Sequence, residues 1–197
     1  IIGCDNLYVR YDPVFINDKY TLEYHIKAFD NMCKLLNGYV NKIIISFVDD
    51  YKNVRKNSNI LNIKKLTEYD YKMIGENFSK SAKENGMTVQ TCFEDINLVN
   101  YGFIKGDCLS SELAFKLTGK KYKDWKSRKG KKCSCVELVD IGVYNSCKHF
   151  CKYCYANYEE NMVNNNYLNH DVTSSLLIGN IEPDDIIKVR SGSLISF

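Results

Sequence analysis

The chain has 197 residues, of which 45% are hydrophobic and 26% are charged, proportions that are ordinary for a globular domain. No apolar run approaches the roughly 18 residues of a membrane helix, so these numbers exclude a membrane-spanning protein and we expect no membrane partner. The net charge is only +3, which excludes a uniformly basic surface.

From the N-terminus, strand and helix patterns alternate. Residues 7–11 (LYVRY) predict a strand that ends at Asp12-Pro13, because proline cannot continue a hydrogen-bonded ladder. A helix over 20–36 follows, and then a continuous apolar run at 42–48 (KIIISFV) that is typical of a buried parallel strand. Thr67 is expected to cap a second helix that Gly86 closes, and 87–92 (MTVQTC) predicts the next strand.

This β-α-β-α-β order predicts an α/β fold with parallel strands, in which ligand sites lie beyond the carboxyl ends of the strands. We therefore expect one rim of candidate catalytic or binding residues, although each could also be a loop charge or a helix cap. The rim residues are Arg10, Asp12, Asp49, Asp50, Cys92, Glu94 and Asp95. His25 and His170 show no partner in the sequence and are assigned no role.

Beyond Gly102 the periodicity weakens. We expect a short helix at 110–117, a strand at 136–143 and a helix at 158–168. Residues 1–130 would form the βα-repeat region, and 131–197 a cysteine-rich segment of the same domain. The chain begins at Ile1 without an initiator methionine, so we expect that it starts inside a longer domain.

Nine cysteines are unusual for a chain of this size. Their odd number and close spacing argue against a disulfide framework and favour metal binding or thiol chemistry in a reducing compartment. We therefore expect a cytoplasmic protein.

Three of these cysteines lie in one stretch, CKHFCKYCYAN, at Cys147, Cys151 and Cys154. Iron–sulfur clusters are held by thiolates at short, mixed spacings, whereas zinc sites usually combine two cysteine pairs or cysteine with histidine. One loop with three thiols therefore favours a 4Fe–4S cluster over zinc, and three ligands would leave one iron open.

This spacing, with Tyr153 before the last cysteine, resembles the signature of the radical S-adenosylmethionine (SAM) enzymes. The resemblance implies that the open iron binds the amino and carboxylate groups of SAM, with Tyr153 and Asn157 as cofactor-binding residues. It also implies that the cluster reductively cleaves SAM after accepting an electron from a donor such as ferredoxin or flavodoxin.

Four further cysteines suggest a second metal site, either an auxiliary cluster or zinc. They stand in polar, loop-like settings at Cys92, Cys108, Cys133 and Cys135. Buried or idle thiols are the alternative.

The chain as a whole resembles an uncharacterised bacterial family, a domain of unknown function with a C-terminal radical-SAM-like cysteine cluster. The resemblance implies an iron–sulfur protein with a partial or permuted TIM-barrel-like fold, and a chain that is truncated at its N-terminus. It is carried by RYDP (10–13), ISFVD (45–49), QTCFE (90–94), CSC (133–135), DIGVYNSC (140–147), CKYCYAN (151–157) and LLIG (176–179).

Two features depart from the radical SAM pattern. The cysteine motif comes late in the chain, and no Gly-Gly-Glu motif for the SAM amine follows it. In a permuted barrel, Asp12, Asp49 or Glu94 would meet that amine instead.

Residues 120–132 (KKYKDWKSRKGKK) carry eight Lys/Arg and one Asp. Lysines interleaved with aromatic residues can hold phosphates and stack bases, and the cysteine loop also resembles that of spore-photoproduct-lyase-like DNA repair enzymes. A nucleic-acid substrate is therefore a candidate beside an unknown small molecule, and a solvated surface loop is the alternative.

Three functions remain open. The first is a SAM-cleaving enzyme in which Arg10, Asp12, Asp49 and Glu94 bind substrate or cofactor. The second is an electron-transfer or sensing protein, with Cys133 or Cys135 as a fourth cluster ligand. The third is a zinc-stabilised nucleic-acid-binding protein.

Overall fold

The computed structural model describes residues 3–92, 94–104, 106–122 and 135–188. The chain divides into two compact units. The described part of the first unit comes from Ile1–Val48 and Asn62–Glu137, and that of the second from Asp49–Leu61 and Leu138–Ser193.

The first unit is built on a parallel sheet with the order β1-β2-β3. Its strands are β1 (Tyr8–Val14), β2 (Lys42–Phe47) and β3 (Thr88–Thr91). The central strand is buried along most of its length, as its apolar sequence predicted.

The prediction that β1 ends at Asp12-Pro13 is wrong, because the strand continues to Val14. Tyr11 pairs with Ile45 and Val14 with Phe47, so the register shifts between Tyr11 and Val14. Pro13 lies at this irregularity, which spares the ladder the hydrogen bond that proline cannot donate.

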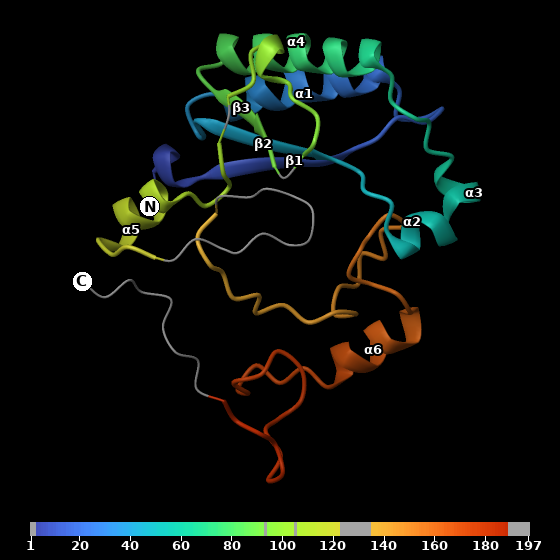
Figure 1. Ribbon diagram of the computed structural model, residues 1–197. Coiled ribbons are helices and arrows are strands. Elements are labelled where there is room, and N and C mark those ends of the chain that lie inside the picture. The colour runs from blue at the N-terminus through green and yellow to red at the C-terminus, as the bar shows by residue number, and fades with distance from the viewer. Residues whose placement is uncertain (1–2, 93, 105, 123–134, 189–197) are drawn as a thin grey trace. The chain divides into compact units, whose positions relative to one another are not determined.

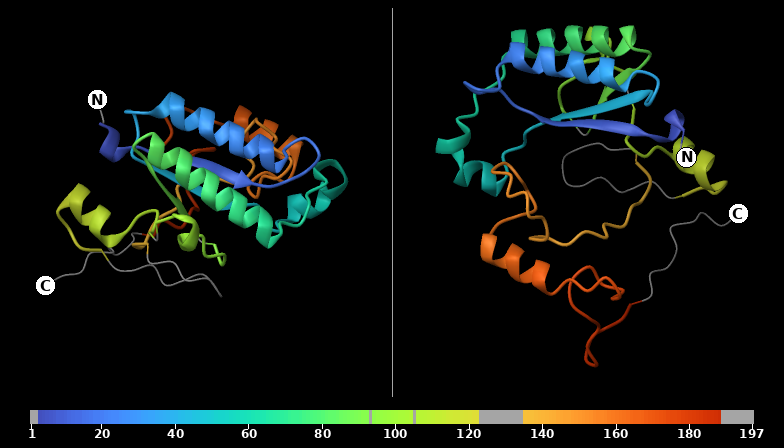
Figure 2. Two further views of the ribbon diagram at one scale, coloured as in Figure 1. Left: turned by 90° about the horizontal axis from the view of Figure 1, so that it is seen from above. Right: turned by 180° about the vertical axis from the view of Figure 1, so that it is seen from behind.

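Two long helices cover one face of the sheet, α1 (Leu22–Leu36) and α4 (Glu68–Glu84) (Figures 1 and 2). Each begins at a threonine whose hydroxyl accepts a backbone N–H, Thr21 for α1 and Thr67 for α4. At α4 the Asp70 carboxylate bonds back to the N–H of Thr67, which completes a capping box. The predicted cap of the second helix is thereby confirmed.

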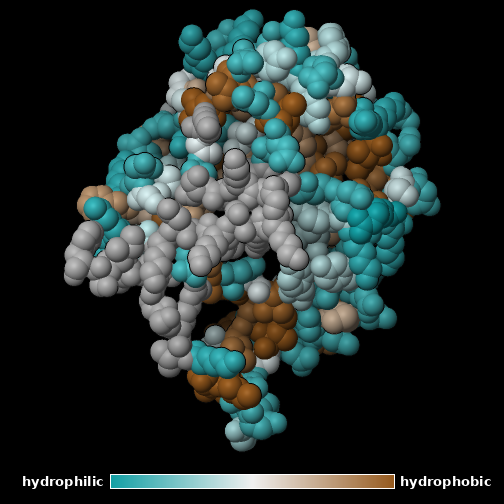
Figure 3. All heavy atoms as spheres, in the orientation of Figure 1, coloured by the Kyte–Doolittle hydropathy of each residue, from teal (hydrophilic) through white to brown (hydrophobic). Residues whose placement is uncertain are grey.

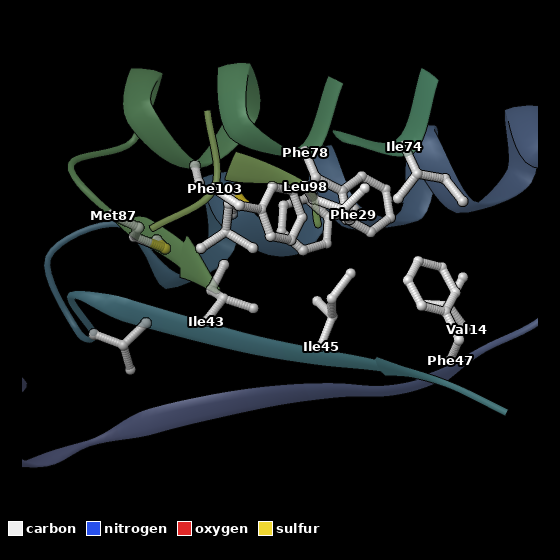
Figure 4. Packing of buried hydrophobic residues seen from close by; sticks show 14 residues of the cluster. Val14, Phe29, Ile43, Ile45, Phe47, Ile74, Phe78, Met87, Leu98 and Phe103 are labelled. Carbon is white, nitrogen blue, oxygen red and sulfur yellow. The ribbon is translucent and has the colours of Figure 1, made fainter. Parts of the chain in front are cut away.

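The core lies between the two helices and the sheet (Figure 4). The rings of Phe29 on α1 and Phe78 on α4 stack with centroids 3.8 Å apart, above Ile43 and Ile45 of β2. The outward face of α4, at the top of Figure 3, is hydrophilic. The helices thus bury their apolar faces on the sheet and expose their polar faces. The ends of the strands lie outside this core and can carry polar residues.

Short elements complete both units. The first unit contains the 3₁₀ turns η1 (Cys4–Asn6) and η2 (Val99–Tyr101) and the helix α5 (Ser111–Thr118). The second contains the helices α2 (Lys52–Lys56), α3 (Ser58–Leu61) and α6 (Glu160–Leu168).

The predicted strand at 136–143 does not form. Val136 is buried, but the apolar side chains that follow it are exposed, with Ile141 at 88% and Val139 at 61%. No described strand offers them a partner, so the apolar pattern alone does not produce a strand.

The α/β class with parallel strands and intervening helices is confirmed. Neighbouring strands follow chain order, as they do in a barrel, but the three described strands form an open sheet without barrel closure. None of the described helices has the length and apolar character needed to cross a membrane.

Candidate functional site

The cysteine loop belongs to the second unit. The side chains of Cys147 and Cys151 are exposed, and Cys154 is half-buried. Among the described cysteines none is paired in a disulfide, so all three thiols of the loop are chemically available.

Two asparagine side chains, from α2 and from the residue that follows it, anchor the backbone of this loop. Asn53 is buried, and its Nδ2 donates to the carbonyl of Cys154 at 2.8 Å and to that of Asn157. Asn57 donates from Nδ2 to the carbonyl of Lys152 at 2.9 Å. Residues about one hundred positions away therefore satisfy loop carbonyls that no regular secondary structure pairs.

Asn145 closes the loop at its base. Its backbone N–H donates to the carbonyl of Ala156 at 2.8 Å, and its Oδ1 accepts the N–H of Tyr158 at 2.6 Å and that of Glu159 at 3.3 Å. It adopts a φ of 57°, a left-handed conformation that asparagine tolerates better than most residues. The backbone and the side chain of one buried residue thus tie the two ends of the loop together.

Local backbone conformation and hydrogen bonds also shape the loop around its cysteines. Phe150 has a φ of 53° immediately before Cys151, an unfavourable conformation for a bulky residue that is found mostly at functional sites. The N–H of Ala156 donates to Sγ of Cys154 at 3.4 Å. Asn157, predicted to bind a cofactor, instead donates from Nδ2 to the carbonyl of Cys147. Tyr153, predicted for the same role, is half-buried.

A surface pocket of about 150 Å³ lies beside Cys151. Its wall contains residues of both charge signs, the basic Lys56 and Lys152 and the acidic Glu159 and Glu160. The remaining lining residues are Asn53, Asn57, Phe150, Cys151, Asn157 and Tyr158. The pocket therefore offers partners for an amino and a carboxylate group next to one of the thiols.

The thiols of the loop are the type of donor that an iron–sulfur cluster uses. The loop supplies three thiols from one anchored segment, and a backbone N–H already donates to one sulfur, the kind of contact that tunes such clusters. Within the described ranges, no three His, Cys, Asp or Glu side chains are already gathered in the arrangement that a metal ion requires.

The first unit holds a second group of reactive side chains, at the carboxyl end of its sheet. Arg10 on β1 donates to Oδ2 of Asp12 from Nε at 3.0 Å and from Nη2 at 2.7 Å. The hydroxyl of Ser46 on β2 donates to the other carboxylate oxygen of Asp12. Arg10 and Asp12, two of the residues expected on one rim, therefore lie in direct contact in the first unit.

Cys92 follows β3 directly and meets Cys108 from the loop before α5. The thiol of Cys108 donates to Sγ of Cys92 at 2.7 Å, and Nη1 of Arg10 lies 3.6 Å from Sγ of Cys108. The hydrogen bond from Cys108, followed by the guanidinium of Arg10, lowers the pKa of Cys92 to about 6. The same sulfur contact and burial raise the pKa of Cys108, so one proton is shared unequally between the two thiols.

Of the other two cysteines of the predicted second metal site, the structure describes only Cys135. Cys135 is buried, and its Sγ accepts the N–H of Leu109, next to Cys108, at 3.5 Å. Cys133 lies outside the described residues. A second metal site stays a prediction.

The remaining acidic candidates have separate surroundings. Glu94 accepts the N–H of Phe47 at 2.9 Å, so its carboxylate caps the end of β2 in the first unit. Asp49 lies in the second unit, exposed, and accepts the hydroxyl of Tyr51 at 3.0 Å. Asp95 is exposed, and Asp50 pairs with Arg55 at 2.9 Å. Most of the basic run, residues 123–132, lies outside the described part of the chain.

Sequence reasoning missed the asparagines that hold the loop, Asn53 and Asn145. An isolated asparagine has no periodic signature, and its partners here lie far away in the chain. Asn145 had one weak signal, its place two residues before the first loop cysteine, where a residue that tolerates left-handed backbone is useful.

Comparison with known proteins gives one result. Neither a curated protein nor a solved structure matches the chain. A family model described as "Domain of unknown function (DUF1848)" matches residues 1–156, a range that includes Cys147, Cys151 and Cys154. Because the match covers most of the 197 residues, the chain belongs to this DUF1848 family.

Proposed function

We propose that this protein binds a 4Fe–4S cluster through Cys147, Cys151 and Cys154, and that it is a radical-SAM-like enzyme. One observation carries the proposal: three available thiols stand on a single loop whose carbonyls are held by Asn53 and Asn57 from outside and by Asn157 from within. Anchoring of the loop backbone lowers the conformational entropy that cluster binding would cost, although the three side chains would still have to turn toward one another.

A bound cluster with one open iron would supply the electron for reductive cleavage of SAM. The chain's own residues would position and protect it. The N–H of Ala156 donates to the Cys154 sulfur, which holds this side chain against the loop backbone. Asn145 ties the ends of the loop together, which keeps the three cysteines at a fixed spacing.

The pocket beside Cys151 suits the amino-acid portion of SAM. Glu159 and Glu160 can accept from an ammonium group, and Lys56 and Lys152 can donate to a carboxylate. At about 150 Å³ it is smaller than the roughly 300–1,000 Å³ of typical ligand pockets, so it would hold one end of the cofactor only. A barrel-like completion of the fold, a small-molecule or nucleic-acid substrate, and a ferredoxin- or flavodoxin-like donor remain parts of the proposal.

Anaerobic reconstitution with iron and sulfide, followed by dithionite and SAM, tests this function. We expect 5′-deoxyadenosine from the unaltered chain and none from Cys151→Ala, whereas the matched control Cys4→Ala retains the activity. A cluster that forms and leaves SAM intact would favour an electron-transfer or sensing protein. A colourless, zinc-loaded protein would overturn both readings.

A further inference from the structure

We propose that Cys92 and Cys108 form a reversible disulfide, and that this pair in the first unit is a thiol–disulfide exchange centre. The site is separate in composition from the cysteine loop, because none of its residues belongs to the second unit. It therefore adds a redox function that the proposed cluster does not require.

The backbone brings the two cysteines together. The N–H of Cys92 donates to the carbonyl of Ile45 at 2.9 Å, which holds Cys92 at the end of the sheet. The segment that leads to Cys108 runs beside β3, since the N–H of Ile104 donates to the carbonyl of Val89 at 2.9 Å. Nε2 of the fully buried Gln90 donates to the carbonyl of Gly106 at 3.2 Å. Cys92 is therefore held by a main-chain hydrogen bond, and the segment before Cys108 is held against β3 by one main-chain and one side-chain hydrogen bond.

The sulfur atoms are 2.7 Å apart, and a disulfide bond measures about 2.05 Å. A closure of roughly 0.7 Å would complete the bond, a shift that side-chain rotation can supply. Both cysteines are partly exposed, so a small disulfide can reach them.

Arg10 makes the pair suited to exchange. Its guanidinium contacts Cys108 at 3.6 Å and is itself held by Asp12. A fixed positive charge beside two thiols favours the thiolate, which is the nucleophile in disulfide exchange. The partly exposed carboxylate of Asp12 limits this effect without cancelling it.

The reaction needs a low-molecular-weight disulfide, RSSR, as the oxidant. The Cys92 thiolate attacks one sulfur of RSSR, the S–S bond breaks, and RS⁻ leaves with its electron pair. Cys108 then loses its proton and attacks Sγ of Cys92, which expels the second RS⁻. The cysteine pair loses two electrons and two protons in total, and RSSR gains them as two RSH molecules.

The test equilibrates the full chain in glutathione buffers of increasing oxidised fraction, then blocks free thiols and maps peptides by mass spectrometry. We expect a Cys92–Cys108 cross-linked peptide that appears as the buffer becomes oxidising and disappears on reduction. Cys4→Ser should leave the transition unchanged, and Cys92→Ser should leave Cys108 without an intramolecular partner.

Three results would overturn the proposal. One is the absence of the cross-link at every glutathione ratio, and another is equal pairing of Cys92 with Cys4 or the loop cysteines. The third is protection of both thiols by stoichiometric zinc, which would make the site a metal centre. The readout is independent of the cluster, because reconstituted Cys92→Ser can still be assayed for iron and sulfide.

Discussion

His25 shows how a single side chain is fixed inside the first unit. Its Nε2 lies 2.7 Å from the carbonyl oxygen of Phe15, and its Nδ1 lies 2.8 Å from the hydroxyl of Tyr11. Since a carbonyl only accepts, Nε2 carries the proton and Nδ1 accepts from Tyr11. Burial lowers the pKa of His25, which keeps the ring neutral in this arrangement. The sequence showed no partner for it because Tyr11 lies on β1 and Phe15 directly after that strand, whereas His25 lies on α1.

Tyr11→Phe would leave Nδ1 of His25 buried without a donor. We expect the free energy of unfolding to fall by about 1–3 kcal/mol, the cost of an unsatisfied buried polar atom. Urea denaturation followed by circular dichroism measures it. Tyr39, which is 70% exposed, supplies the control: Tyr39→Phe should change the unfolding free energy by less than about 0.5 kcal/mol. Equal effects of the two variants would contradict this role for Tyr11.

The reactivity of Cys92 should depend on pH in a specific way. Its pKa is lowered to about 6 by Cys108 and Arg10, against an opposing effect of burial and Asp12. The rate of alkylation at Cys92 should therefore rise with a midpoint near pH 6, well below the pH of about 8.5 for an ordinary thiol. Arg10→Gln should move the midpoint upward, because it removes the positive charge that stabilises the thiolate. A wild-type midpoint near 8.5 would rule out the described pairing.

At the scale of elements, local patterns predicted the first unit well. β2 was expected at 42–48 and spans Lys42–Phe47. The helix that Thr67 caps was expected to close at Gly86, and its last residue is Glu84. These elements have strong apolar periodicity and caps that act within one turn. The segment at 136–143 has an equally apolar sequence, but a strand needs a neighbour, and that information is not local.

Packing between α4 and η2 leaves no room for a side chain at one position of the helix. A Cβ added at Gly75 would lie 2.6 Å from Cβ of Tyr101. Glycine to alanine in an exposed helix interior stabilises by about 1 kcal/mol, but here we expect the overlap to destabilise by about 1–3 kcal/mol. Thermal or urea unfolding measures whether Gly75→Ala raises or lowers the free energy of unfolding. Lys80→Ala on the exposed face of α4 should stay within about 0.5 kcal/mol of the wild type.

The anchoring of the cysteine loop by α2 gives a prediction for the proposed cluster. Asn53→Ala removes the donor to the carbonyls of Cys154 and Asn157. We expect iron to be lost to a chelator about tenfold faster, in line with the effect of residues that orient metal ligands. Asn85, which donates to Ser81 at the end of α4, is the matched control, and Asn85→Ala should not change the rate. Identical rates for both variants would show that the loop does not depend on α2.

At the scale of the whole molecule, the sequence predicted the site only in part. The three thiols of the loop and the meeting of Arg10, Asp12 and Cys92 near one sheet end follow from spacing and strand order. The sequence grouped Cys92 with Cys108 only as half of a four-cysteine metal site. It did not predict their direct contact or the asparagine anchors, because these contacts join loops without a repeating pattern. The division into two units was also not anticipated, since α2 and α3 are separated in sequence from the rest of the second unit.

The central claim is that Cys147, Cys151 and Cys154 hold one 4Fe–4S cluster. Iron and sulfide quantification with electron paramagnetic resonance, on anaerobically reconstituted and dithionite-reduced protein, tests it most directly. Our account predicts about four iron and four sulfide per chain and a reduced-cluster signal, lost in Cys147→Ala, Cys151→Ala and Cys154→Ala and kept in Cys4→Ala. Full iron content and an unchanged signal in all three loop variants would contradict it.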